Sequence, residues 1–409
     1  MAKKLLTLLI ATATFFMASA SNKGLSAEET QKVETSAKAE SKPSLTINED
    51  GKYSISVSGN VNMRLGYDFN GSITSHPDFV TALIPVPGDY SSDKFFYMDA
   101  TTSRVEVKGL AKSEKLGDVV LCLNMDFRGG SMGSYTPRLR LAYVEFAGFT
   151  IGRSYTTFCD LGAAVPNIDF EGPCVCPYIY TTQLGYTHSW LDERVNIGVA
   201  LEHHGYQSMS LNDDFVAQSI YLPTIPAHVE YKWGKDLNSH IRLTGLYKSN
   251  PVYDVANDRT INLNGWGTQL SGSIGVGERL KFYYSGTCGE GITDFMQDLY
   301  GSGLDVTMSD TTTPQPQLTF MNGWQIVGLM QTSERTLISM GYSAVNICGD
   351  ASRFEADDYR RGEYAYANIF YSLTPRIKFA TEYLWGKRKN VNNESNTANR
   401  INAMVQYSF

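Results

Sequence analysis

Apolar and polar residues alternate along most of the chain, starting near residue 52. In the last nine residues, Ile401, Val405 and Phe409 fall on one side of this alternation, and the polar Asn402 and Gln406 fall on the other. Successive side chains of a β-strand point to opposite faces, so a period of two predicts a strand with one apolar face.

Segments with this period recur along the chain and are bounded by turn residues. We predict sixteen strands, near residues 53–67, 101–109, 118–128, 137–147, 149–158, 179–189, 194–203, 226–234, 239–248, 264–275, 279–288, 323–332, 335–345, 363–372, 376–386 and 400–409. Short connections follow every even strand, and long connections follow most odd strands. Short turns at one end and long loops at the other are typical of a membrane barrel inserted from the periplasm.

The predicted fold class is therefore all-β, a transmembrane antiparallel β-barrel of about sixteen strands whose apolar face contacts lipid. Aromatic residues near the predicted strand ends, such as Tyr67, Tyr143, Trp324 and Trp385, suit the girdles at the two membrane interfaces. The aromatic Phe409 fits a C-terminal signal for outer-membrane assembly.

The first twenty residues have Lys3 and Lys4, an apolar run and then Ala18-Ser19-Ala20. This pattern predicts a signal peptide at 1–20, cleaved after Ala20, with a second cleavage site after Ala27 as the alternative. A short charged periplasmic segment is expected at 21–51, and the barrel domain at 52–409. Export and the barrel pattern together predict a location in the outer membrane of a Gram-negative cell.

The composition fits a thin wall between lipid and water. The chain has 25 Tyr, 19 Phe and 36 Gly among its 409 residues, yet its mean hydropathy is only −0.23. Without Lys3 and Lys4, 33 basic residues stand against 42 acidic residues, a net charge of −9. This balance argues against nucleic acid and anionic lipid surfaces as partners.

The face opposite the lipid face collects basic residues, at Arg64, Arg104, Lys108, Arg128, Arg138, Arg140, Arg242 and Lys378. Cations on neighbouring strands repel one another, so a lumen that keeps them is expected to attract anions. The alternative is a solvated interior in which these charges pair with Glu106, Asp126 and Glu382.

The loop after the fifth strand, residues 159–178, combines apolar residues with the acids Asp160, Asp169 and Glu171. Its apolar content would be unusual in open water. We therefore expect it to fold inward as a constriction loop whose acids face the basic wall. A disulfide between Cys159 and either Cys174 or Cys176 is one reading of the cysteines, and free thiols are the other. Their spacing does not predict a metal site, and no cofactor is expected.

Three stretches resemble the DcaP-like trimeric porins: "RLRLAYVEF" with "GFTIGRSYTTFCDLGAAVPNIDFEGP", residues 265–305, and the C-terminal "PRIKFATEYLWGKRKNVNNESNTANRINAMVQYSF". The resemblance covers roughly residues 52–409. It implies a sixteen-stranded barrel, a homotrimer, and passive uptake of small anionic solutes such as dicarboxylates. A weaker resemblance of "TSRVEVKG" and "RLRLAYVEF" to general porins implies that Arg104 and Arg140 lie at the narrowest point.

The leading prediction is a porin, not an enzyme, with outer-membrane lipid and small anionic solutes as its partners. One alternative is a surface adhesin that uses the long loops. A less favoured alternative is a barrel hydrolase, for which His188-Ser189 and His203-His204 are the histidine clusters to test. His188 and Ser189 are adjacent on a strand, so their side chains are expected on opposite faces.

Overall fold

The structure is a computed structural model that describes residues 44–46, 52–75, 77–87, 94–203, 209–309 and 313–409. The predicted signal peptide at 1–20 lies outside these residues. The predicted segment at 21–51 also lies outside them, except for β1 (Ser44–Thr46), which pairs antiparallel with residues 54–56. No helix in the described part of the chain is long and apolar enough to cross a membrane.

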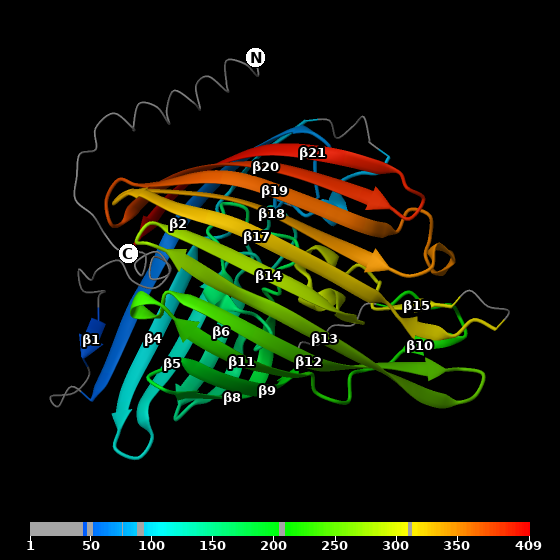
Figure 1. The fold of residues 1–409 in the computed structure, drawn as a ribbon, viewed down its shortest axis with the longest axis horizontal. Coiled ribbons are helices and arrows are strands. Elements are labelled where there is room, and N and C mark those ends of the chain that lie inside the picture. The colour runs from blue at the N-terminus through cyan, green and yellow to red at the C-terminus, as the bar shows by residue number, and fades with distance from the viewer. Residues whose placement is uncertain (1–43, 47–51, 76, 88–93, 204–208, 310–312) are drawn as a thin grey trace.

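Sixteen strands of the described chain form one closed antiparallel wall. These are β2 (Tyr53–Asn70), β4 (Arg104–Ser113), β5 (Gly117–Asp126), β6 (Arg138–Phe146), β7 (Phe149–Tyr155), β8 (Tyr180–Trp190), β9 (Val195–His203), β11 (Ile225–Trp233), β12 (Ser239–Asp254), β13 (Arg259–Val276), β14 (Leu280–Glu290), β17 (Phe320–Ser333), β18 (Thr336–Cys348), β19 (Tyr359–Ser372), β20 (Ile377–Asn390) and β21 (Ser395–Ser408). Figure 1 shows them tilted side by side around the barrel. All sixteen predicted strands are confirmed.

The remaining strands of the described chain are short. β1, β3 (Phe95–Asp99) and β10 (Phe215–Ala217) pair with the wall. β15 (Val306–Met308) and β16 (Pro316–Leu318) pair with each other in a separate two-stranded sheet. Strand β3 pairs with the loop end of β2, and β4 pairs with the other half of β2, so β3 and β4 together cover one side of β2. The wall closes where β2 pairs with β21 in the register Val61↔Tyr407 and Arg64↔Met404.

The alternation of faces follows the sequence pattern. On β5, Leu121 and Leu123 are 45% and 47% exposed, whereas Cys122 between them is fully buried. A strand with an apolar side in lipid and a polar side in a lumen shows this distribution. The outward side therefore provides the lipid-contacting surface, and the inward side carries most of the polar residues.

The barrel interior contains a hydrophobic core to which three connections and the inner faces of several wall strands contribute. The connection after β2 contributes Phe79 and Ile84, and the connection after β7 contributes Phe158. The connection after β14 contributes Phe295 and Leu299. All five side chains are fully buried. The rings of Phe158 and Phe295 lie 5.4 Å apart, centroid to centroid. Loops that bury apolar side chains against one another in this way fill part of the lumen with packed protein.

Candidate functional site

The connection 156–179 lies against the inner face of the wall through hydrogen bonds to several strands. The carboxylate of Asp160 accepts a hydrogen bond from Ser271 of β13 at 2.6 Å. The backbone amides of Ile168 and Asp169 donate to Glu382 of β20 at 3.0 and 2.8 Å. Asn368 of β19 donates to the carbonyl oxygen of Pro166 at 2.8 Å. These contacts hold the segment against the inner face of the wall.

Three of the predicted basic residues surround one aromatic side chain of this segment. The guanidinium carbons of Arg128, Arg138 and Arg104 lie 4.4, 5.6 and 6.0 Å from the centroid of the Phe170 ring. Arg104 comes from β4, Arg138 from β6, and Arg128 follows β5. A guanidinium group within ~6 Å of a ring centroid is attracted by the negative face of the ring. The loop therefore meets the basic wall through Phe170.

Arg140 completes this wall. Its Nε and Nη2 donate to the hydroxyls of Tyr180 and Tyr155, each at 2.8 Å. The carboxylate of Asp126 lies 3.6 Å from Arg140 and 2.6 Å from Arg138. One buried carboxylate thus serves two arginines, and the tyrosine hydroxyls fix the direction of the Arg140 guanidinium group.

Arg64 is sequestered from the lumen. Its side chain is 1% exposed and forms ion pairs with Asp99 at 2.5 Å and with Asp78 at 3.2 Å. Asp78 also pairs with Arg128 and belongs to the connection after β2. The predicted role of Arg64 as a pore-lining cation does not match this burial, because its charge is used to hold the connection inside the barrel.

The other predicted basic residues lie apart from the Phe170 cluster. Lys108 pairs with Glu106 at 3.1 Å, with 35% of its side chain exposed. Arg242 donates to the carbonyl oxygen of Thr157 at 2.5 Å and therefore braces the start of the inward segment. The Nζ of Lys378 lies 5.9 Å from the ring centroid of Phe370.

The three predicted loop acids bond to partners other than the arginine cluster. Asp169 accepts hydrogen bonds from the backbone amide of Phe79 at 2.9 Å and the hydroxyl of Tyr364 at 3.0 Å. Glu171 accepts from Gln297 at 3.1 Å. The expectation that these carboxylates face the basic wall is corrected by these contacts. The acids anchor the segment, and Phe170 between two of them contacts the arginines.

Burial changes how these loop acids ionise. Burial and the charges of Asp78 and Glu382 raise the pKa of Asp169 to about 7. Burial also raises the pKa of Glu171. For Asp160, burial favours a higher pKa, but hydrogen bonds from His240 and Ser271, with the nearby Arg242 charge, lower it to about 2.

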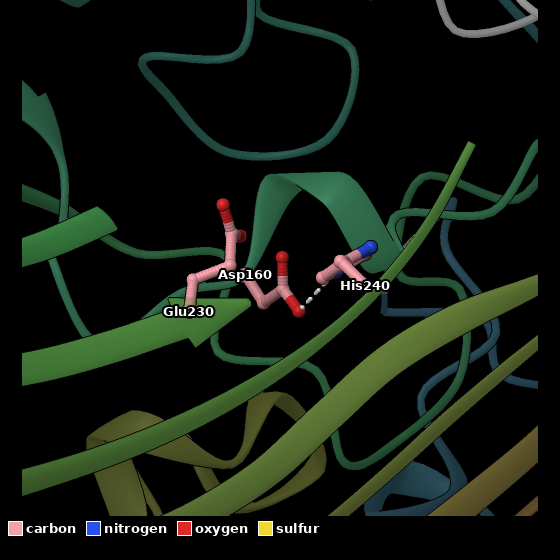
Figure 2. Close-up of side chains that lie close together, drawn as sticks. All are labelled: Asp160, Glu230 and His240. Carbon is pink, nitrogen blue, oxygen red and sulfur yellow. Dashed lines mark hydrogen bonds and ion pairs between the residues drawn. The ribbon is translucent and has the colours of Figure 1, made fainter. Parts of the chain in front are cut away.

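Asp160, Glu230 and His240 form the group of side chains that could hold a metal ion among the described residues, with ligand atoms within 4.8 Å of one another. Figure 2 shows the loop carboxylate between the strand residues Glu230 and His240. His240 Nε2 lies 2.9 Å from Asp160, and Lys232 lies 3.2 Å from Glu230. Because these carboxylates already have cationic or hydrogen-bonding partners, the geometry fits a loop anchor better than a metal centre.

All six cysteines are free thiols, so the predicted disulfide is absent from the structure. Cys174 Sγ lies 3.1 Å from Ser343 Oγ, and Cys176 Sγ donates to Gln325 at 3.4 Å. Both thiols are thus bonded to the barrel wall, and Cys159 is buried as a free thiol.

Two further predictions concern the chain end and the histidines. Phe409 exchanges backbone hydrogen bonds with Gly59, at 3.0 and 3.1 Å, and thereby extends the seam between the first and last strands. His188 lies with its ring 4.4 Å from that of Trp190, whereas Ser189 donates to Asn196. The two side chains therefore point apart, as predicted, and do not form a nucleophile and base pair.

Sequence reasoning missed Asp78, Tyr155 and Tyr180. Asp78 lies in an irregular connection, where no periodicity indicates which way a side chain points. The two tyrosines flank the ends of strands, and only their bonds to Arg140 separate them from interfacial aromatic residues.

A closed sixteen-stranded antiparallel barrel with an apolar outer face is the fold of the outer-membrane β-barrel proteins. The model of the DcaP outer membrane protein family matches residues 18–409, so the chain belongs to that family. A comparison with curated protein sequences gives no match. The chain is therefore an outer-membrane protein of this family, and three similar solved structures share its fold.

The outer membrane channel DcaP of Acinetobacter baumannii has 18% identity and a TM-score of 0.75, over 89% of this chain and 99% of that one. The anion-selective porin from Comamonas acidovorans has 11% identity and a TM-score of 0.56, over 87% of this chain and all of that one. Salmonella typhi OmpF, in complex with daunomycin, has 11% identity and a TM-score of 0.57, over 89% of this chain and all of that one. These likenesses concern the fold.

Proposed function

We propose that the protein is a passive channel for small, preferentially anionic solutes of the dicarboxylate type. The observation that carries this proposal is the arginine cluster around Phe170. The passage runs between this basic wall and the inward segment 156–179, which acts as the constriction. The acids of that segment are occupied by protein partners, so the charges left to act on a solute there are positive.

The concentration of cations on the wall supports anion preference. Four guanidinium groups lie on it, those of Arg104, Arg128, Arg138 and Arg140. Asp126 pairs with two of them, Arg138 and Arg140. A solute with two carboxylates could contact separate guanidinium groups, each through a charge-assisted hydrogen bond.

The test is the reversal potential of the purified protein in a planar bilayer under a salt gradient. The wild type is compared with Arg104→Ser/Arg140→Ser, and Lys112→Ser/Lys115→Ser removes two exposed charges near the short-turn end as a control. We expect an anion-selective current that shifts toward cation preference only in the arginine variant. Stable insertion without conductance would contradict the channel proposal and favour the adhesin alternative.

The assembly we propose is a homotrimer in the outer membrane. Its support is the resemblance of the sequence to trimeric porins over residues 52–409. Native mass spectrometry of the detergent-solubilised protein would give three times the mass of one mature chain, and a monomer mass under several mild detergents would contradict it.

A further inference from the structure

The outward face of β19 and β20 carries a group of cationic side chains near the loop end of the barrel. Tyr364 of β19 and Arg388 of β20 point inward, where they bond to Asp169 and to the carbonyl oxygen of Ala82. Because alternate residues of a strand face opposite ways, the residues at 361, 387 and 389 point outward. These are an arginine and two lysines, which we call the rim cations.

The strand register brings the rim cations together. Arg361 lies directly opposite Lys389, and Glu363 lies opposite Lys387. The next outward position on β20, toward the short-turn end, is Trp385. Directly opposed outward side chains on adjacent strands have their Cβ atoms about 5 Å apart. The three cations therefore form one patch on the outer surface.

An aromatic band lies beside this patch, on its membrane side. Tyr383 and Trp324 are 47% and 44% exposed, and the ring of Trp324 lies 5.5 Å from that of Tyr342. Exposed Trp and Tyr side chains on a membrane barrel mark the depth of the lipid headgroups. The rim cations lie just beyond this band on the long-loop side, so they reach the polar region of the outer leaflet.

The rim cations carry positive charge that is available to bind an anion. The carboxylate of Glu363 already accepts from Arg361 Nε at 2.8 Å and from the hydroxyl of Tyr342. Among the described residues, neither lysine of the patch forms an ion pair. The chain as a whole is acidic, and the loop that leads into β19 carries carboxylates at Glu355, Asp357 and Asp358. The attraction is therefore local to the patch.

We propose that Lys387 and Lys389, assisted by Arg361, bind the phosphorylated headgroup of a lipid in the outer leaflet. The two lysines lie on one face of β20, about 7 Å apart along the strand. Ammonium groups at that spacing can contact one phosphate or two phosphates of the same headgroup. The aromatic band would contact the upper part of the acyl chains of that lipid. This inference depends on the membrane placement of the barrel and is independent of solute selectivity.

Native mass spectrometry of the full-length mature protein tests the proposal. The probes are a bisphosphorylated diglucosamine lipid and the same lipid after enzymatic removal of both phosphates. The variant is Lys387→Gln/Lys389→Gln, and Lys112→Gln/Lys115→Gln is the matched control with two lysines lost at the opposite end. We expect the first variant to bind the phosphorylated lipid about tenfold more weakly or worse, and the control to bind as the wild type does.

Two results would overturn the inference. One is equal binding of the phosphorylated and dephosphorylated lipids by the wild type, which would assign the affinity to the apolar band alone. The other is a change in oligomer mass in the Lys387→Gln/Lys389→Gln variant, which would place a second copy of the chain on this face. Reversal potentials are recorded on the same samples. If they still show anion selectivity, either of these two results contradicts the lipid-binding proposal alone and not the channel proposal.

Discussion

The guanidinium carbon of Arg128 lies 4.4 Å from the centre of the Phe170 ring. Phe170 stands between Asp169 and Glu171 in sequence, yet it alone of these three reaches the arginines, because both carboxylates are bonded elsewhere. The ring covers a face of the guanidinium group and leaves its edge donors for other partners. A solute anion would therefore meet the arginines beside this ring.

Replacing Phe170 with alanine should enlarge the passage and keep its charge. We expect a higher single-channel conductance with unchanged anion preference, because the variant removes volume beside the arginines without removing a cation. Single-channel recording with salt-gradient reversal potentials measures both quantities. Phe158→Ala, a fully buried position in the inner core, is the control: it should lower stability by about 3–5 kcal/mol. Unchanged conductance in Phe170→Ala would place the passage away from the ring.

The elevated pKa of Asp169 predicts a pH dependence of stability. The pKa of this carboxyl is about 7 in the folded protein and ~4 in the unfolded chain. Its contribution favours folding below about pH 4 and is lost as the pH rises through about 7. Asp169→Asn, which keeps an oxygen for the Phe79 amide, should flatten this part of the pH profile. Thermal melting of the detergent-folded barrel between pH 4 and 8 measures it, and identical profiles would contradict the prediction.

Lys248 holds the connection after β14 inside the barrel. Its ammonium group is buried and lies 2.9 Å from Asp294 and 2.7 Å from Asp305. Lys248→Met should destabilise the protein by about 3–5 kcal/mol, because two carboxylates would stay buried without their cation. The comparison is Lys235→Met, whose exposed pair with Glu278 should contribute at most ~1 kcal/mol. Denaturant unfolding of the two variants under one condition distinguishes them.

The thiols of the inward segment should be unreactive in the folded protein. Burial raises the pKa of Cys159 and Cys174, and it raises the pKa of Cys176 to about 12. The thiolate is the reactive form, so maleimide should label these three residues only after unfolding. Mass spectrometry of tryptic peptides, without reductant, gives the extent of labelling. Absence of labelling in the unfolded, unreduced protein would instead indicate a disulfide.

Phe409 is expected to matter for assembly more than for stability. Its side chain is 40% exposed, so Phe409→Ala removes little buried area from the folded barrel. We expect less folded protein in isolated outer membranes and a melting temperature within a few degrees of the wild type. Heat-modifiability on gels quantifies the folded fraction. A Tyr407→Ala variant, 44% exposed on the same strand, controls for loss of an exposed aromatic residue.

The strands were predictable because lipid and water impose opposite demands on alternate residues. The ends of the strands were harder to predict. Strand β12 ends at Asp254, beyond the predicted end at residue 248, and β13 begins at Arg259, before the predicted start at residue 264. This part forms a long hairpin between the two strands, visible at one end of Figure 1. Where both faces can be polar, the period of two disappears from the sequence while the backbone pairing continues.

A β-bulge between β5 and β6 made the predicted orientation of Tyr143 wrong. The pairing of β5 and β6 shifts by one residue between Asn124 and Met125, next to Arg140. Beyond the shift, Tyr143 lies directly opposite the buried Cys122 and therefore faces inward. The sequence had placed Tyr143 in an outer girdle, since strict alternation carries no record of an extra residue.

The site was predicted in part. The basic residues and the inward course of segment 156–179 could be read from alternation and from apolar content. The partners of the loop acids could not, because they include the Phe79 amide and Gln297, which belong to connections distant in sequence. Contacts between irregular segments depend on three-dimensional packing, for which a single sequence offers no periodic signal.

The pairing of β2 with β21 has a consequence for biosynthesis. The first strand of the wall has its final neighbour only once residues 395–408 exist, so an incomplete chain would present two unpaired sheet edges. Each edge exposes backbone groups that could pair with other chains. Premature termination anywhere before the last strand should thus yield material that periplasmic chaperones retain and proteases remove.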